Sequence, residues 1–149
     1  MFDLIFDFAL LAAVYALIYK LRLKKRDGRY RVWFTLFYLY VCMVICVTLM
    51  PFQLVLPGAN GNALEEINLE PFRDLKRGYL GAQSGIVLNC IMFLPMGFLL
   101  PTLKKRGIIK VFLLSLLASL MIECVQFLYC WGAAAGRRAA DVTDLIMNT

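Results

Sequence analysis

Four long apolar segments limit the folds that this chain can adopt. An α-helix needs about 20 mostly apolar residues, with a range of about 17–25, to cross the hydrocarbon core of a bilayer. Backbone polar groups cannot stay unpaired in lipid, so such segments are helical there. We therefore predict an all-α fold, a polytopic transmembrane helical bundle of four helices plus the start of a fifth. The four helices are expected at residues 2–19, 33–50, about 85–103 and about 108–131.

The composition agrees with a membrane protein and restricts its chemistry. Hydrophobic residues make up 62% of the chain, whereas roughly 45–50% is usual in soluble domains. Histidine is absent, which removes the commonest general base and the commonest metal ligand. The five cysteines show no CxxC spacing, and we interpret them as free thiols, with a disulfide of Cys130 as the alternative. We predict no cofactor and no metal site.

Lysine and arginine gather in two loops. Residues 20–31 carry seven basic residues and one acid, and residues 104–110 carry four basic residues and no acid. Eleven of the sixteen Lys and Arg residues therefore lie on one side of the bundle. By the positive-inside rule that side is cytoplasmic, and the N-terminus lies outside the cell membrane. We interpret the net charge of +6 as a topology signal and predict no nucleic-acid partner.

The chain divides into two predicted parts. Residues 1–32 form an N-terminal transmembrane helix and a basic cytoplasmic loop, and residues 33–149 form a membrane domain. The first helix has an acidic leading end, with Asp3 and Asp7, and no small-residue cleavage site follows, which argues against a secretory signal. In the outer loop, "EPFRDLKRG" (70–78) predicts a short surface helix with Pro71 at its first position.

The fourth apolar segment contains polar residues at helical spacing. Ser115, Ser119, Glu123 and Gln126 follow one another at intervals of four, four and three, so they share one face of the helix. A charged side chain at a helix centre costs about 2.5–3.5 kcal/mol on insertion scales. We therefore expect this face to contact other helices, and Glu123 to have a partner or to be protonated.

Other unexpected polar residues lie at a similar depth. Glu123 comes eight residues before Trp131, roughly 12 Å below the outer helix end at about 1.5 Å per residue. Asn89 lies four residues into the third helix, which enters from the same side. A further helical face, spaced three, three and four, is formed by Arg138, Asp141, Asp144 and Asn148. We expect all of these groups to converge on one site in the outer half of the bilayer.

Each residue of this site has a predicted role. Arg138 is expected to be the cation for a phosphate or carboxylate, because arginine can snorkel along its stem; Arg73 is the alternative. Glu123 is expected to be its intramembrane counter-charge. The remaining roles are neutral hydrogen bonding for Asn89 and Gln126, and orientation of the last helix for Asp141 and Asp144.

Two residues predict an irregularity in the third helix. Pro95 cannot donate to the carbonyl of Ile91, and Gly97 weakens the following turn, so the helix should bend there. The bend is either a kink that improves packing or a concavity beside Asn89 that admits a ligand.

Four interpretations of the polar residues stay open on the sequence alone. They are interhelical contacts that fix the register of the bundle, a site for a lipid head group or amphiphile, a metal-dependent lipid-modifying enzyme, and ion translocation. The first two are favoured. Carboxylates without histidine rarely build a hydrolytic zinc site, and the polar groups stop in one leaflet. The oligomeric state is not predicted.

In these residues the chain resembles the VanZ-like family, teicoplanin-resistance-protein-like membrane proteins of bacteria. The matching pieces are "VTLMPF" (47–52), "INLEPFRDL" (67–75), "LNCIMFLPMGFLLP" (88–101), "SLMIECVQF" (119–127) and "RRAADVTDLIMNT" (137–149). The family's characteristic positions carry over onto Asn68, Pro71, Phe72, Asn89, Pro95, Gly97, Glu123, Gln126, Arg138, Asp141, Asp144 and Asn148. An acid usually precedes the position of Asp144, where this chain has Thr143.

The resemblance implies a role in the bacterial cell envelope. The family's named member is associated with resistance to the lipoglycopeptide teicoplanin, so the expected partner is a membrane lipid or a lipid-linked amphiphile bound at the outer leaflet. Family members continue past the positions of Asn148 and Thr149 into a glycine-rich helix. We therefore expect the chain to be a truncated form whose final helix is incomplete.

Overall fold

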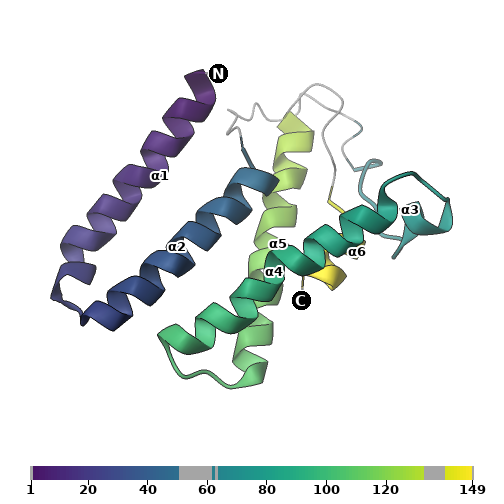
Figure 1. Ribbon diagram of the computed structural model, residues 1–149. Helices are drawn as coiled ribbons and strands as arrows, with labels where there is room; N and C mark the ends of the chain where they lie inside the picture. Colours follow the sequence, from purple (N-terminus) through teal and green to yellow (C-terminus); the bar gives the residue numbers. More distant parts are fainter. Residues whose placement is uncertain (1, 51–61, 63, 133–139, 149) are drawn as a thin grey trace.

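The structure, a computed structural model, describes residues 2–50, 62, 64–132 and 140–148. Each of its four long helices is long and apolar enough to cross a membrane. They are α1 (Phe2–Leu21), α2 (Gly28–Thr48), α4 (Ala82–Leu103) and α5 (Ile108–Gly132) (Figure 1). The shorter elements are a 3₁₀ turn (Leu23–Lys25), α3 (Arg73–Lys76) and α6 (Val142–Met147). The predicted all-α bundle of four helices and the start of a fifth is confirmed, and the described ranges contain no strand.

The core of the bundle lies between α2 and α4, and α5 packs against it. Its buried side chains are Tyr40 and Val44 of α2 and Met92, Phe93, Met96, Leu99 and Leu100 of α4. Many large apolar side chains outside this core are exposed, such as Phe6 at 68% and Leu94 at 72%. Such an apolar surface is typical of a protein that contacts lipid chains.

The first helix is held to the second by tyrosine side chains. The Tyr38 hydroxyl donates to the carbonyl of Leu11 at 2.6 Å, and the Tyr15 and Thr35 hydroxyls lie 2.7 Å apart. The rings of Tyr15 and Tyr38 are 5.0 Å apart between centroids. Because a tyrosine pairs an apolar ring with a polar hydroxyl, it can fill this interface and satisfy a polar group in it.

Replacing Tyr38 with phenylalanine is expected to weaken the attachment of α1 to α2 by about 1 kcal/mol, the net value of one hydrogen bond. The ring contact with Tyr15 is retained, so the change tests the hydroxyl alone. The measurement is a titration with sodium dodecyl sulfate in mixed micelles, followed by near-ultraviolet circular dichroism. Tyr79→Phe makes the same change at an exposed side chain; equal losses in both variants would contradict the assignment.

Helix α4 is continuous through its internal proline. Pro95 lies in the middle of the helix, and Gly97 follows it without a break in the helical segment. A Cβ atom added at Gly97 would meet nothing within 4 Å, so close packing does not require glycine there. The predicted bend remains a prediction, but a cavity lined by both Pro95 and Asn89 does adjoin the helix.

The short helix of the loop between α2 and α4, which we call the outer loop after its predicted side, begins later than the sequence predicts. Pro71 was expected at its first position, but α3 covers Arg73–Lys76. The residue between them, Phe72, has φ 59° and ψ 27°, a left-handed conformation that is uncommon outside glycine. A helix cannot pass through such a residue, so Pro71 belongs to the turn before the helix.

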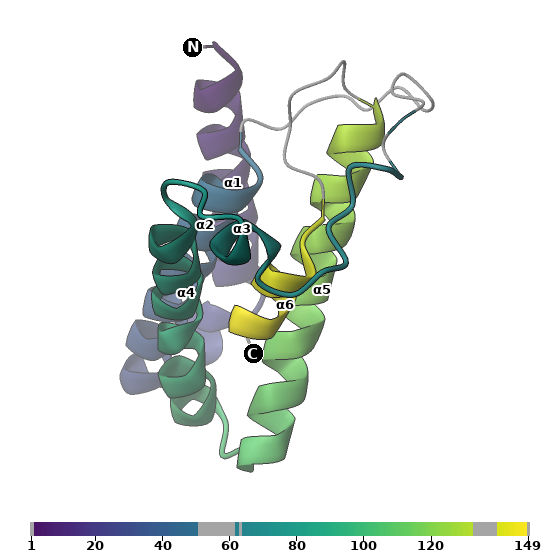
Figure 2. The ribbon, with the colours of Figure 1, turned by 90° about the vertical axis from the view of Figure 1, so that its right-hand side faces the viewer.

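Helix α6 lies between α4 and α5, beside the middle of α5 (Figures 1 and 2). It is six residues long and contacts both neighbouring helices. The loop that contains α3 packs against the start of α4 on the same side. These short segments position the polar residues of the candidate site.

Candidate functional site

The polar face of α5 points into the bundle, as its spacing predicts. Ser115, Ser119 and Glu123 are all buried, and Glu123 is 6% exposed. Leucine and methionine side chains on the other faces, such as Leu117 and Met121, are exposed. The carboxylate therefore lies among protein groups and away from acyl chains.

The described contact of Glu123 is with a backbone group of the last segment. Its Oε2 accepts a hydrogen bond from the backbone N–H of Asp141 at 2.9 Å. Asp141 has an extended backbone, with φ −124° and ψ 122°, so this N–H is free of helical bonding and can point at α5. A hydrogen bond to an ionised acceptor is roughly twice as strong as a neutral one, which offsets part of the cost of burying the carboxylate.

Both carboxylate oxygens of Asp141 are used within the protein. Oδ1 accepts the backbone N–H of Thr143 at 2.7 Å, which caps the N-terminus of α6. Oδ2 accepts from the side-chain amide of Asn68 at 2.9 Å. The prediction that Asp141 shares a helical face with Asp144 is wrong, because α6 begins at Val142 and Asp141 is its N-cap.

Residue 68 pairs with residue 141 as in a parallel sheet. The Asn68 N–H donates to the carbonyl of Ala140, and the Val142 N–H donates to the carbonyl of Asn68, both at 2.9 Å. Asn68 is 4% exposed, and its Oδ1 accepts the N–H of Glu70 at 3.2 Å. The outer loop and the last segment are therefore fastened together above Glu123.

Thr143 fixes the left-handed turn of the outer loop. Its Oγ1 accepts the backbone N–H of Phe72 at 3.0 Å, and the side chain is buried. The Thr143 hydroxyl therefore supplies the acceptor that holds this turn.

Three more polar side chains connect the helices. The Asn89 amide of α4 donates to Asp144 of α6, and the Asn148 amide donates to Ser119 of α5 at 3.0 Å. Gln126 of α5 donates to the carbonyl of Thr48 at 3.3 Å, one of the carbonyls that a helix end leaves without a partner. Helices α2, α4, α5 and α6 are joined by these bonds.

The two predicted cations have different outcomes. Arg138 lies outside the described residues, so its role stays a prediction. The Nε atom of Arg73 lies 3.9 Å from Asp74 at the start of α3, and this contact is with the outer loop. Sequence reasoning expected a cation beside Glu123 and missed the backbone donor of Asp141. An acid followed by Thr143 and Asp144 before an apolar run is a helix N-cap signature that could have indicated it.

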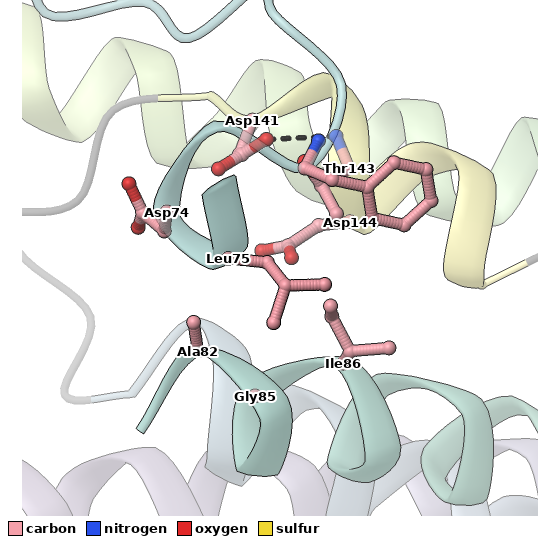
Figure 3. A pocket seen from close by; sticks show the side chains of 9 residues that line it. Asp74, Leu75, Ala82, Gly85, Ile86, Asp141, Thr143 and Asp144 are labelled. Atoms are coloured by element: carbon pink, nitrogen blue, oxygen red, sulfur yellow. Dashed lines mark hydrogen bonds between the residues drawn. The ribbon is translucent and has the colours of Figure 1, made fainter. Parts of the chain in front are cut away.

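A small polar cavity lies between α6 and the start of α4. Its volume is about 30 Å³, enough for roughly one water molecule. Figure 3 shows three carboxylates around it, those of Asp74, Asp141 and Asp144, with Leu75 beside Asp144 and with Ile86 on α4. Within the described ranges no three His, Cys, Asp or Glu side chains are arranged to hold a metal ion.

A larger groove lies between α2 and α4 and has a volume of about 530 Å³. Its apolar lining consists of Met43, Val47, Leu88, Ile91, Met92 and Pro95. Its polar lining is Thr48, Asn89, Gln126 and Asp144. Asn89 precedes Pro95 by six residues, roughly 9 Å along the helix, and Thr48 ends α2. The groove is therefore polar toward the end of the bundle where α2 ends and α4 begins, and apolar farther along both helices.

The profile of the family described as VanZ/LLP1 matches residues 35–149. The chain belongs to the VanZ/LLP1 family. The matched region begins within α2, so it includes the groove, the polar residues of α5 and α6, and the outer loop.

Among curated proteins, this VanZ/LLP1 chain is similar to Protein VanZ of Enterococcus faecium. The two are 30% identical over 112 residues, which cover 74% of this chain and 63% of VanZ. The chain thus spans less than two thirds of the length of that relative. No solved structure matches the chain.

Proposed function

We propose that this multi-span VanZ-family protein binds a lipid-anchored amphiphile at the outer leaflet of the cell membrane. The observation that supports it is the groove of about 530 Å³, which is lined by apolar residues and carries polar groups at one end. Ligand sites are concave, mostly apolar, and carry a few placed polar groups. An acyl chain would lie along Met43 and Pro95, and the polar group would meet Asn89, Gln126 and Asp144.

The proposed orientation places the groove's polar end outside the cell. Residues 20–31 and 104–110, the loops after α1 and α4 with the adjoining helix ends, carry eleven basic residues, and the positive-inside rule puts them in the cytoplasm. The N-terminus and α6 then lie on the outer side. An amphiphile could enter the groove sideways from the outer leaflet, because both α2 and α4 expose apolar residues to lipid, such as Val47 and Leu88.

The six predicted site residues divide by position. Asn89, Gln126 and Asp144 line the groove, so we assign them to direct contact with the ligand. Glu123 accepts a hydrogen bond from the Asp141 N–H at the N-terminus of α6, so we assign both residues to holding that helix in place. Arg138, by the sequence pattern, supplies the cation for a phosphate or carboxylate of the ligand.

Teicoplanin is the probe that tests this function, because the named family member is associated with resistance to it and because it carries a fatty acyl chain. The full chain in lipid nanodiscs is expected to bind teicoplanin and to bind a glycopeptide without an acyl chain much more weakly. Biolayer interferometry measures both affinities. Equal binding of the two compounds, or binding of neither, would overturn the proposal.

Asp144→Asn is expected to weaken teicoplanin binding about tenfold, since hydrogen bonds to charged groups are worth about 1.5–3 kcal/mol and 1.4 kcal/mol is tenfold. Asparagine keeps an oxygen acceptor for the Asn89 amide, so the helix contact is retained. Asp74→Asn is the matched control, because Asp74 lines the small cavity but not the groove. If both variants bind alike, Asp144 does not contact the ligand.

A purely structural role for the polar residues is the second candidate. The observation that favours it is a set of hydrogen bonds that join the outer loop, α5 and α6 to one another. They are made by Glu123, Asp141, Asn68 and Thr143. In that case Asp144→Asn would change stability without changing the affinity for any amphiphile. Unfolding and binding measured on the same variant separate the two functions.

A further inference from the structure

A second cavity lies at the opposite end of the bundle, beside the basic loops. It has a volume of about 330 Å³ and lies between the start of α2 and the end of α4. Its lining consists of Asp27, Arg29, Tyr30, Trp33 and Thr102. We propose that this cavity binds the phosphate head group of an anionic phospholipid from the leaflet on the basic side.

Charge complementarity is the first argument for this occupant. The loops at residues 20–31 and 104–110 both end at this side of the bundle (Figure 1) and hold eleven basic residues and one acid. Arg29 lines the cavity itself, and the Arg26 guanidinium lies 5.5 Å from the centre of the ring of Tyr30, which is another lining residue. Basic pockets between transmembrane helices on the cytoplasmic side suit anionic lipid head groups.

The aromatic lining is the second argument. Tyr and Trp side chains favour the level of the head groups, where the ring is partly apolar and the polar tip is wet. Trp33 packs edge-on against Phe98 of α4, with ring centroids 6.1 Å apart, and Tyr30 stacks on Phe34. The cavity therefore joins a charged rim to an apolar wall, which matches the boundary between a lipid's phosphate and its acyl chains.

One carboxylate opposes the phosphate. Asp27 lines the same cavity, and its Oδ2 caps α2 by accepting the backbone N–H of Arg29 at 3.1 Å. Its negative charge reduces the attraction for an anion. Asparagine caps helices about as well as aspartate, so Asp27→Asn removes the charge and keeps the cap. Removing the charge of Arg29 should therefore weaken the binding of an anionic head group, and removing the charge of Asp27 should strengthen it.

The experiment uses Trp33 as the reporter inside the cavity. The chain contains two tryptophans, so Trp131→Phe leaves Trp33 as the emitter. The full-length protein is reconstituted into phosphatidylcholine vesicles that contain increasing fractions of phosphatidylglycerol with brominated acyl chains, which quench on contact. Brominated phosphatidylcholine at the same fractions is the reference. The expected result is stronger quenching of Trp33 by the anionic lipid at low mole fraction.

Three variants test whether the cavity is specific. A basic residue near a membrane surface contributes about 1 kcal/mol to anionic lipid binding, so Arg29→Gln is expected to weaken relative affinity for phosphatidylglycerol about fivefold. Asp27→Asn is expected to strengthen it. Lys105→Gln, at the same end but outside the cavity lining, is the matched control and is expected to change it less than about twofold. Each variant leaves at least ten of the eleven loop cations, which retains the topology signal.

Equal effects of Arg29→Gln and Lys105→Gln would overturn the proposal, because diffuse attraction to the surface would then explain the binding. Equal quenching by the two brominated lipids would also overturn it. Inorganic phosphate at millimolar concentration is the last arm. Because the ion and the lipid head group would compete for one cavity, phosphate is expected to reverse the quenching more than chloride at equal ionic strength; equal effects of the two salts would contradict a phosphate-binding cavity.

Discussion

Glu123→Lys is expected to prevent accumulation of the folded protein, at a cost of about 3–5 kcal/mol, the range for leaving an uncompensated buried charge. A lysine ammonium carries donors and no acceptor, and at this position it would face the backbone N–H of Asp141. Two donors would then oppose each other between α5 and the start of α6. The measurement is the amount of protein in the membrane fraction and its elution as a single species after mild detergent extraction.

Glu123→Gln is the isosteric control for this change. Glutamine keeps an oxygen that accepts the Asp141 N–H, so the cost is expected to be about 1 kcal/mol, the difference between a charged and a neutral acceptor. This variant is expected to accumulate and to weaken teicoplanin binding less than Asp144→Asn, because Glu123 does not line the groove. Loss of the glutamine and lysine variants to the same extent would show that the negative charge itself is required for folding.

Asp141→Ala is expected to lower the free energy of unfolding by about 2–4 kcal/mol. Loss of a helix cap costs about 0.5–2 kcal/mol, and a buried donor left without a partner costs about 1–3 kcal/mol. The donor in question is the side-chain amide of Asn68, which is 4% exposed and bonds to Asp141 at 2.9 Å. Unfolding in mixed micelles by added sodium dodecyl sulfate measures the change.

Two companion variants separate the contributions of Asp141. Asp141→Asn keeps the cap on Thr143 but places an amide near that of Asn68, so an intermediate loss is expected. Asp74→Ala removes a partly exposed carboxylate whose described ion pair, with Arg73, is 3.9 Å long, and is expected to cost less than about 0.5 kcal/mol. A loss for Asp141→Ala no larger than for Asp74→Ala would contradict the cap and the Asn68 contact together.

The spans were predictable because membrane insertion depends on local composition. An apolar run of sufficient length is helical in lipid whatever its neighbours are, so α1, α2, α4 and α5 were predictable to within a few residues. The buried face of α5 was predictable for a similar reason, since the spacing of Ser119 and Glu123 fixes their direction. Both inferences use residues within one helix.

The contacts between segments were not predictable in the same way. Periodicity indicates which side chains share a face, but the bond to Glu123 comes from a main-chain N–H. The left-handed turn at Phe72 is held by Thr143, 71 residues away in the sequence. Because of this turn, α3 begins at Arg73 and not at Pro71. The prediction that Asp141 lies on a helical face with Asp144 was wrong because residue spacing alone does not distinguish an N-cap residue from a residue inside the helix.

The pairing of Asn68 with Asp141 also sets the order in which the molecule can be completed. Asn68 is synthesised before α4 and α5, and Asp141 follows 73 residues later. Asn68 therefore has no Asp141 to bond to while these two helices insert into the membrane. Over that interval Glu123 reaches the bilayer without the Asp141 N–H, and the outer loop has no strand to pair with. The cluster at the start of α6 therefore cannot close before residue 141 has been made, and a nascent chain stalled before that residue would present its polar groups unpaired to membrane quality control.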